Sequence, residues 1–123
     1  MSQVHPPLVL LIDDDPQFRY LLQRYTQSSN LRFNAAGFDS RAGEAIISDP
    51  PALILLNLTS SALHRLTAIH ALQAQLSRRD IPLILCSTFE QNETFREFAV
   101  DHWLWKPVMY DDFRAALAQV GLV

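Results

Sequence analysis

The chain has little of what marks a secreted, membrane-spanning or nucleic-acid-binding protein. Its 123 residues include one cysteine, Cys86, which excludes an internal disulfide and favours a reducing compartment. No apolar run approaches the ~20 residues that cross a bilayer, and the amino terminus lacks the pattern of a signal peptide. The net charge is −3, and the chain has no basic cluster beyond Arg78-Arg79, which argues against direct binding of nucleic acid. We therefore expect a cytoplasmic protein that contacts neither membrane nor nucleic acid.

The composition instead indicates a single folded domain over residues 1–123. Hydrophobic residues make up 49% of the chain and charged residues 19%, which is typical of a globular protein. Short, continuous apolar runs alternate with segments whose apolar residues recur at helical spacing. Strands that are apolar throughout are covered on both faces. The alternation therefore predicts an α/β fold, a doubly wound parallel sheet with helices on both faces.

Five strand–helix units are predicted along the chain. The expected strands cover 8–12, 31–35, 52–58, 81–86 and 102–105. The first helix is expected to start at Asp15-Pro16, because aspartate caps free N–H groups and proline suits the first helical position. The later helices are expected over 40–48, from 66 to about 77–80, over the weakly patterned stretch 90–100, and after a first turn that holds Asp111 and Asp112.

Polar side chains follow four of the predicted strands. Asp13 and Asp14 follow the first strand, Asn57 ends the third apolar run, Ser87 follows the fourth strand and Lys106 follows the last. In an open parallel sheet the ligand site lies outside the carboxyl ends of the strands. We therefore expect these five side chains to converge. A carboxylate at position 57 would suit the group to phosphoryl transfer, but an amide is not such a nucleophile.

Four segments make nearly the whole chain resemble the receiver domain of bacterial two-component response regulators. They read Leu-Leu-Ile-Asp-Asp-Asp-Pro at 10–16, Leu-Ile-Leu-Leu-Asn-Leu at 53–58, Ile-Pro-Leu-Ile-Leu-Cys-Ser at 81–87 and Trp-Leu-Trp-Lys-Pro at 103–107. The resemblance implies a flavodoxin-like, five-stranded parallel sheet of order 2-1-3-4-5 with five helices. It also implies a signalling module of a two-component or phosphorelay system rather than an enzyme.

By this resemblance, Asp13 and Asp14 match the acid pair that holds magnesium, and Asn57 takes the place of the phosphoacceptor aspartate. The chain thus resembles a pseudo-receiver that is not phosphorylated at the usual position. Mg²⁺ requires hard oxygen ligands with strong negative charge. Because one formal charge is missing, no cofactor is expected to be required. A metal site formed by Asp13, Asp14 and Asn57 would bind Mg²⁺ weakly at most. A plain alternative is that the acids only cap a helix and carry solvated charge.

The resemblance extends to the fourth and fifth strands. Ser87 matches the hydroxyl that follows the phosphoryl group, and Lys106 matches the lysine that pairs with it. Trp103 lies three residues before that lysine, where the family carries its switching aromatic. The Lys106–Pro107 peptide is expected to be cis, as in the family. The alternatives are that Ser87 is an ordinary hydrogen-bonded residue and that Lys106 neutralises one of the two acids.

The chain departs from the family pattern around the same pocket. The loop 59–65 lacks the usual proline and glycine, the stretch 99–102 replaces a run of small residues, and the segment between Ser87 and Lys106 is short. These clustered departures indicate divergence from phosphorylation, whereas a single engineered replacement of aspartate at position 57 is the alternative. We therefore expect phosphorylation-independent action, with regulation by a ligand or cation in the degenerate pocket as the nearest variant.

The expected partner is a protein: a kinase, an output domain or a second copy of the chain. The expected contact surface consists of the fourth helix, the fifth strand and the fifth helix. Trp103 and Trp105 alternate onto one face of that strand, and two large indoles there favour a contact surface. We expect Trp103 to anchor the contact and Trp105 to support the fold.

An enzyme is the alternative from another functional class. Asp13-Asp14-Asp15 contains the Asp-x-Asp of haloacid-dehalogenase-like phosphotransferases, with Asp13 as nucleophile, Asp15 as general acid and Lys106 as charge stabiliser. The chain is short for that fold, and Gln17 stands where the motif prefers threonine or valine. The sequence therefore favours the signalling interpretation.

Overall fold

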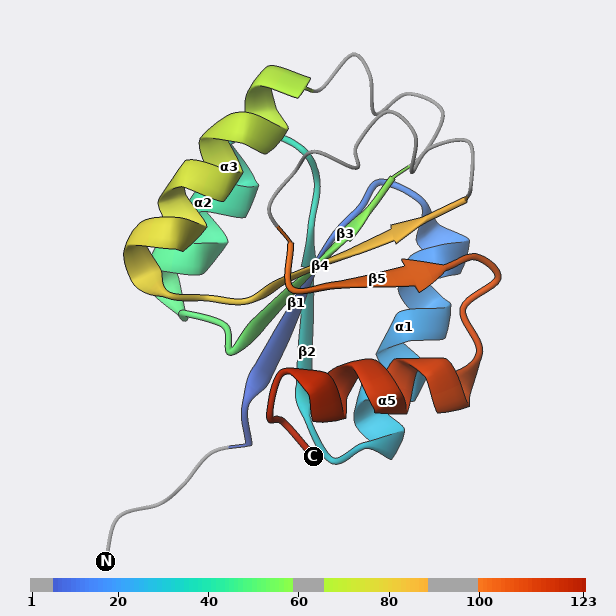
Figure 1. Cartoon of the computed structure of the whole chain (residues 1–123). Coiled ribbons are helices and arrows are strands. Elements are labelled where there is room, and N and C mark those ends of the chain that lie inside the picture. Colours follow the sequence, from blue (N-terminus) through green and yellow to red (C-terminus); the bar gives the residue numbers. More distant parts are fainter. Residues whose placement is uncertain (1–5, 59–65, 89–99) are drawn as a thin grey trace, which may run out of the picture.

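The computed structural model describes residues 6–58, 66–88 and 100–123 (Figure 1). Within these ranges the backbone forms five strands and four helices. In chain order they are β1 (Leu8–Ile12), α1 (Pro16–Ser28), β2 (Arg32–Ala36), α2 (Ser40–Ser48), β3 (Leu53–Asn57), α3 (Leu66–Arg79), β4 (Leu83–Ser87), β5 (His102–Trp105) and α5 (Tyr110–Gln119).

The five strands form one parallel sheet in the order β2-β1-β3-β4-β5, which confirms the predicted topology. Helices α2 and α3 lie on one side of the sheet, and α1 and α5 lie on the other (Figure 1). The strand order reverses at β1, which pairs with both β2 and β3. The carboxyl ends of β1, β3 and β4 therefore meet at one edge of the sheet, where doubly wound folds place their ligand sites.

Two hydrophobic clusters cover the two faces of the sheet. One joins alternate strand residues such as Leu10 and Ile54 to Ile69 on α3, and the other joins Val9 to Phe113 on α5. Every residue of β1, β3 and β4 is buried, because successive side chains point to opposite faces and each face is covered by helices. This two-sided core explains why these strands are apolar almost throughout.

The helix boundaries follow local capping chemistry. Asp15 caps α1 by accepting a hydrogen bond from the Gln17 N–H at 3.0 Å, with Pro16 at the first position, as predicted. Asp39 caps α2 in the same way. After α5 the chain turns at Gly121, whose φ of +81° is a conformation that glycine adopts without strain.

The predicted boundaries differ from the structure by one or two residues at some strands. Strand β2 covers 32–36 rather than 31–35, and β4 starts at Leu83 rather than Ile81. The start of β4 has a simple cause, because Pro82 has no N–H to donate to a ladder. The loop 59–65 and nearly all of the helix expected over 90–100 lie outside the described residues.

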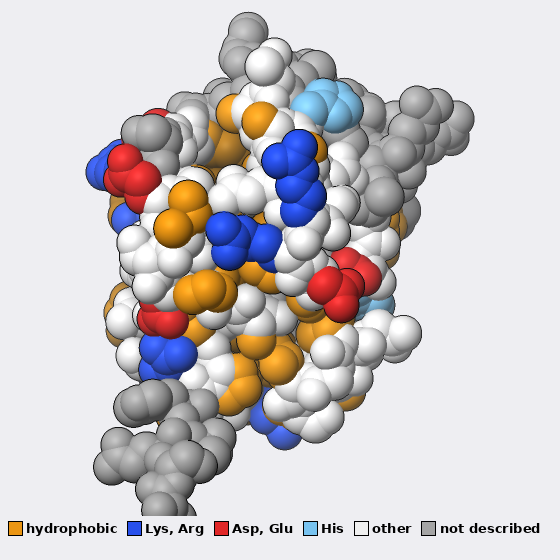
Figure 2. Space-filling view, turned by 90° about the vertical axis from the view of Figure 1, so that its left-hand side faces the viewer, with side chains coloured by type: hydrophobic (Ala, Val, Ile, Leu, Met, Phe, Trp, Pro, Cys, Tyr) orange, Lys and Arg blue, Asp and Glu red, His pale blue; other side chains and the backbone are white. Residues whose placement is uncertain are grey.

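The surface formed by α2 and α3 carries hydrophobic, basic and acidic side chains that are interspersed rather than gathered by type (Figure 2). Among the described residues, no helix is long and apolar enough to cross a membrane.

Candidate functional site

Three of the predicted pocket residues lie buried at the carboxyl edge of the sheet. The register pairs Ile12 with Leu56 and Asn57 with Cys86, so the residues that end β1, β3 and β4 stand side by side. Asp13 and Ser87 are 0% exposed and Asn57 is 1% exposed. Long-range strand pairing thus brings together three polar groups that are between 30 and 74 positions apart along the sequence.

The Asn57 amide is tied to the Asp13 carboxylate. Its Nδ2 donates a hydrogen bond of 2.9 Å to Asp13 Oδ1, and the Asp15 N–H donates to the same oxygen at 3.0 Å. Burial raises the pKa of the Asp13 carboxyl above its ordinary value, and the two hydrogen bonds oppose that rise. The amide therefore supplies, by a neutral donor, some of the stabilisation that a cation would give a buried carboxylate.

Several oxygen atoms in this group have no hydrogen-bond partner among the described residues. They are Asp13 Oδ2, Asn57 Oδ1 and Ser87 Oγ. A buried polar atom without a partner costs about 1–3 kcal/mol, so proteins seldom leave several together without a functional reason. Two of the three oxygens are acceptors only, and the third belongs to a hydroxyl that can also donate.

Lys106 stands beside this group without contacting a carboxylate. Its Nζ donates a hydrogen bond of 2.6 Å to the Leu58 carbonyl oxygen and lies 5.4 Å from the centre of the Phe18 ring. Partial burial lowers the pKa of the ammonium group, and attraction to acidic groups, Asp13 among them, limits the fall. The hydrogen bond of Lys106 goes to a backbone carbonyl, and its interaction with Asp13 is electrostatic, so the alternative that Lys106 neutralises an acid stays a prediction.

Asp14 does not join the buried group. Its side chain is exposed, and it lies over Gly37 at the end of β2: a Cβ added to Gly37 would stand 2.7 Å from Asp14 Oδ1. The Asp13 N–H donates to the Ala36 carbonyl at 2.9 Å, which extends the β1–β2 pairing and brings the next residue of each strand together. The resemblance assigns Asp13 and Asp14 the same role, whereas in the structure Asp13 is buried and Asp14 is exposed.

Trp103 and Trp105 lie on the same side of β5, as predicted, with ring centres 6.4 Å apart and planes inclined by 22°. Trp103 is partly buried against the hydrophobic cluster under α2 and α3, and Trp105 is 39% exposed. The expectation that Trp105 is the more structural of the two is wrong. The register explains this result, since Trp103 pairs with Leu85 inside the sheet and Trp105 with Ser87 at its end.

No family model matches the chain, and no curated protein matches it. Solved structures do. A sensor protein from Polaromonas sp. JS666 is 24% identical with a TM-score of 0.77, covering 93% of this chain and 94% of that chain. The chemotaxis protein CheY4 from Vibrio cholerae is 18% identical with a TM-score of 0.75, covering 94% and 98%. The anti-anti-sigma factor PhyR from Bartonella quintana is 21% identical with a TM-score of 0.74, covering 97% and 48%.

The chain has the receiver fold. Identities of this size establish the architecture and leave the role of each residue to be argued from the geometry. Within that fold, the Lys106–Pro107 peptide is cis, as the resemblance implies.

The residues present fit a magnesium ion poorly. In the receiver fold the ion would lie among Asp13, Asp14 and position 57. Here one carboxylate is buried, the second lies over Gly37, and the amide at 57 directs its nitrogen at the first. Among the described residues, no group of three acidic, histidine or cysteine side chains is placed to hold a metal. Mg²⁺ prefers several charged oxygens in octahedral geometry, which this arrangement does not supply.

Two further residues adjoin the buried polar group: Arg19, which the sequence pattern did not indicate, and Cys86, which stands in an apolar run and is expected in the core. Arg19 on α1 donates from Nη2 to the Asp13 carbonyl oxygen, so a helix residue fixes the backbone at the end of β1. Cys86 is fully buried next to Asn57, and burial raises the pKa of its thiol to about 12. A thiol of that kind is not reactive at neutral pH.

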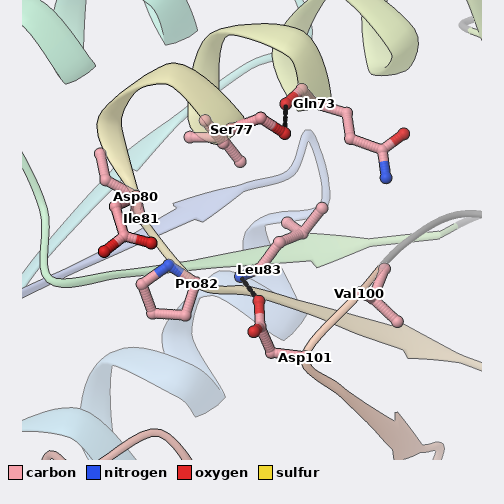
Figure 3. A pocket seen from close by; sticks show the side chains of 9 residues that line it. Gln73, Ser77, Asp80, Ile81, Pro82, Leu83, Val100 and Asp101 are labelled. Atoms are coloured by element: carbon pink, nitrogen blue, oxygen red, sulfur yellow. Dashed lines mark hydrogen bonds between the residues drawn. The ribbon is translucent and has the colours of Figure 1, made fainter.

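A cavity of about 440 Å³ lies at the opposite, amino end of β4 (Figure 3). Two hydrogen bonds join residues that line it: Ser77 Oγ donates to the Gln73 carbonyl at 3.1 Å, and the Leu83 N–H donates to Asp101 Oδ2 at 2.8 Å (Figure 3). The first bond is internal to α3, and the second joins the start of β4 to the residue that precedes β5. The cavity therefore serves the scaffold and is separate from the candidate site.

Proposed function

We propose that this chain is a receiver-like signalling module that is not phosphorylated at position 57 and acts by binding a protein partner. The receiver fold supports the signalling role, and solved structures of the same fold carry the names of response regulators and of an anti-anti-sigma factor. A cytoplasmic location and the absence of direct nucleic-acid binding remain part of this proposal, in line with the net charge of −3.

The observation that carries the proposal is the buried Asn57 amide. Acyl phosphate formation needs a carboxylate oxygen that is free to attack phosphorus. At position 57 the side chain is neutral, 1% exposed, and bound through Nδ2 to Asp13 Oδ1 at 2.9 Å. Asp13 is a poor substitute nucleophile because its carboxylate is 0% exposed, so a phosphoryl donor cannot reach it.

The proposed contact surface includes the end of β5 and the start of α5. Trp105 is 39% exposed and stacks on Trp103, and Met109, which caps the start of α5, is 58% exposed. β5 is the edge strand of the sheet. Exposed tryptophan and methionine are enriched in protein interfaces, because large, adaptable side chains bury much area on contact.

Phosphorylation is tested by incubating the protein with acetyl phosphate and Mg²⁺ and measuring its intact mass. We expect no adduct, and the Asn57→Asp variant serves as the control that has a carboxylate at the usual position. A stoichiometric phosphoryl adduct on the natural sequence, at Asp13 or Asp14, would overturn the proposal.

Partner binding is tested by comparing the natural chain with Trp105→Ala. Sedimentation velocity over a range of concentrations measures self-association, and capture from a lysate followed by mass spectrometry identifies other proteins. We expect the substitution to weaken whichever complex forms by tenfold or more, since truncating an aromatic anchor often costs about 2 kcal/mol. Tyr20→Ala is the matched control, because Tyr20 is 60% exposed and belongs to α1, which is not part of the proposed surface.

No observation favours the phosphotransferase alternative. The residue assigned there as general acid, Asp15, accepts the Gln17 N–H and caps α1. The assigned nucleophile is fully buried. Hydrolysis of a small phosphate ester by the natural chain, lost in Asp13→Asn, would be the result that supports an enzyme.

A further inference from the structure

The second acid of the pair, Asp14, occupies a site that the missing side chain of Gly37 leaves open. A Cβ at position 37 would lie 2.7 Å from Asp14 Oδ1, closer than Cβ atoms approach oxygen in folded proteins. The same hypothetical atom would lie 3.3 Å from Arg41 Nη2 and 3.7 Å from Asp39 Oδ2. Three charged groups therefore surround the bare backbone of Gly37, which is itself buried.

Arg41 is the cation of this cluster. Its Nη2 is 2.8 Å from Asp39 Oδ2, and the Asp39 hydrogen bonds raise the pKa of the guanidinium, with a smaller contribution from Asp14. Asp39 is held in turn as the cap of α2, where it accepts the Arg41 N–H at 2.9 Å. The helix start thus fixes the arginine over Gly37, where it and the Asp14 carboxylate lie near the same backbone and attract one another.

We propose that Gly37 and Arg41 hold the Asp14 carboxylate away from the pocket. The pocket then lacks charged metal ligands at two independent positions, 14 and 57. This inference rests on the proposed function and deepens it. At position 57 the ligand is missing because of residue type, since an amide stands in place of a carboxylate. At position 14 the ligand is missing because of its location, since the Asp14 carboxylate is present but lies exposed over Gly37, whereas Asp13 is buried. Restoring aspartate at position 57 alone therefore leaves a weak metal site.

The two residues act on Asp14 in different ways, and the difference makes the proposal testable. Gly37 acts by leaving space, which does not depend on ionic strength. Arg41 acts by charge, and its side chain is 71% exposed, so dissolved salt screens the attraction. Attractions between exposed charges are weak, so we expect affinity changes of about threefold to fivefold rather than large ones.

The first experiment measures Mg²⁺ affinity by titration calorimetry in the Asn57→Asp background. Adding Gly37→Ala should displace Asp14 and tighten Mg²⁺ binding about threefold to fivefold relative to Asn57→Asp alone. Alanine suits the backbone there, because the φ of Gly37 is not in the left-handed region. The matched control is Gly43→Ala on α2, whose added Cβ would meet only Gln75 Oε1 at 3.7 Å and should leave the affinity unchanged.

The second experiment separates charge from space. Arg41→Gln in the same background should tighten Mg²⁺ binding at low salt, and the gain should shrink when KCl rises from 50 to 500 mM, with a Debye length falling from about 14 Å to about 4 Å. The gain from Gly37→Ala should survive the same change. If neither substitution alters the affinity of Asn57→Asp, or if none of the variants binds Mg²⁺, the position of Asp14 is not what limits the site and the proposal is wrong.

A third measurement keeps the test independent of the Asn57→Asp background. In the natural sequence, the carboxyl ¹³C resonance of Asp14 should move in Gly37→Ala and in Arg41→Gln, and stay in place in Gly43→Ala. An Asp14 carboxyl chemical shift that is the same in the natural protein and in all three variants would contradict the proposal. The proposed function has its own separate readout, because a phosphoryl adduct on the natural chain would refute it whatever Asp14 does.

Discussion

At the end of β3 the Asn57 side chain is 1% exposed, whereas at the end of β5 the Trp105 side chain is 39% exposed. Both residues close apolar strands at the same edge of one sheet. The first region is a closed polar group in which Asn57 and Asp13 are hydrogen-bonded to one another, and the second is an open aromatic surface on an edge strand. The closed region has an amide at position 57, where the proposed function requires that no carboxylate stands, and the open region contains the exposed indole of the proposed contact surface.

Different physical requirements act on the two regions. A buried polar group is stable only if its members satisfy each other, so a change at one position must be matched at the next. Exposed aromatic side chains need not pair with one another, so substitutions there mainly affect contacts with other molecules. We therefore expect substitutions in the closed region to change stability and substitutions in the open region to change binding.

The largest expected effect is the loss of the bond between Asn57 and Asp13. Asn57→Ala removes the donor from a buried carboxylate, and hydrogen bonds to charged groups contribute about 1.5–3 kcal/mol. We expect urea unfolding at pH 7 to show a loss of about 2–3 kcal/mol. Asn34→Ala is the control, since that asparagine is exposed on β2. A loss below about 0.5 kcal/mol would mean that the two side chains are not coupled.

The next effect separates the two tryptophans. Trp103→Ala should cost about 2 kcal/mol of stability, because its ring packs against the cluster under α2 and α3. Trp105→Ala should cost about 0.5–1 kcal/mol, mostly the ring stacking, and should mainly change association. Urea unfolding of both variants, followed by sedimentation, gives the comparison. Equal losses of stability would show that the open region is part of the core.

A third effect concerns the pH dependence of the closed region. Burial raises the folded-state pKa of Asp13 above its ordinary value of 3.8, so folding favours the uncharged acid. Its contribution is fully present below the unfolded pKa and is lost as the pH rises through the folded pKa. Asp13→Asn stays uncharged, so we expect it to exceed the natural protein in stability at pH 7 by about 1 kcal/mol.

The measurement for this prediction is urea unfolding of both proteins at several pH values between 3.5 and 7, a range that brackets the ordinary aspartate pKa of about 3.9. The difference between them isolates position 13 from the other acids. It should grow as the pH rises and close toward the acid end. A difference that is constant with pH would show that the carboxyl has the same pKa folded and unfolded.

The smallest expected effect is that of Mg²⁺ on the natural protein. Binding stabilises the folded state by RT ln(1 + [L]/Kd), so ~10 mM Mg²⁺ at a weak site adds at most about 1 kcal/mol. We expect a rise in Tm below about 5 °C, with CaCl₂ at the same ionic strength as the control. A larger rise in Tm that is specific to Mg²⁺ would show that the closed region binds the metal and would contradict this prediction.

Much of the fold follows from local pattern. Continuous apolar runs predict β1, β3 and β4 because both faces of those strands are buried, and Asp15-Pro16 predicts the start of α1 because capping is local. The strand order came from the family resemblance and is confirmed by the structure. The boundaries of β2 and β4 shifted because ladder pairing, rather than the apolar run, sets where a strand begins.

The sequence by itself determined which polar residues end the strands, since the apolar runs stop at them. Only the tertiary structure decided how those residues are used. Pairing of Ile12 with Ala36 places Asp14 beside Gly37, and pairing of Trp105 with Ser87 leaves that indole at the open end of the sheet. These outcomes depend on register between segments that are far apart in the chain. No local pattern encodes that register, because it is set by how the whole sheet buries its apolar faces.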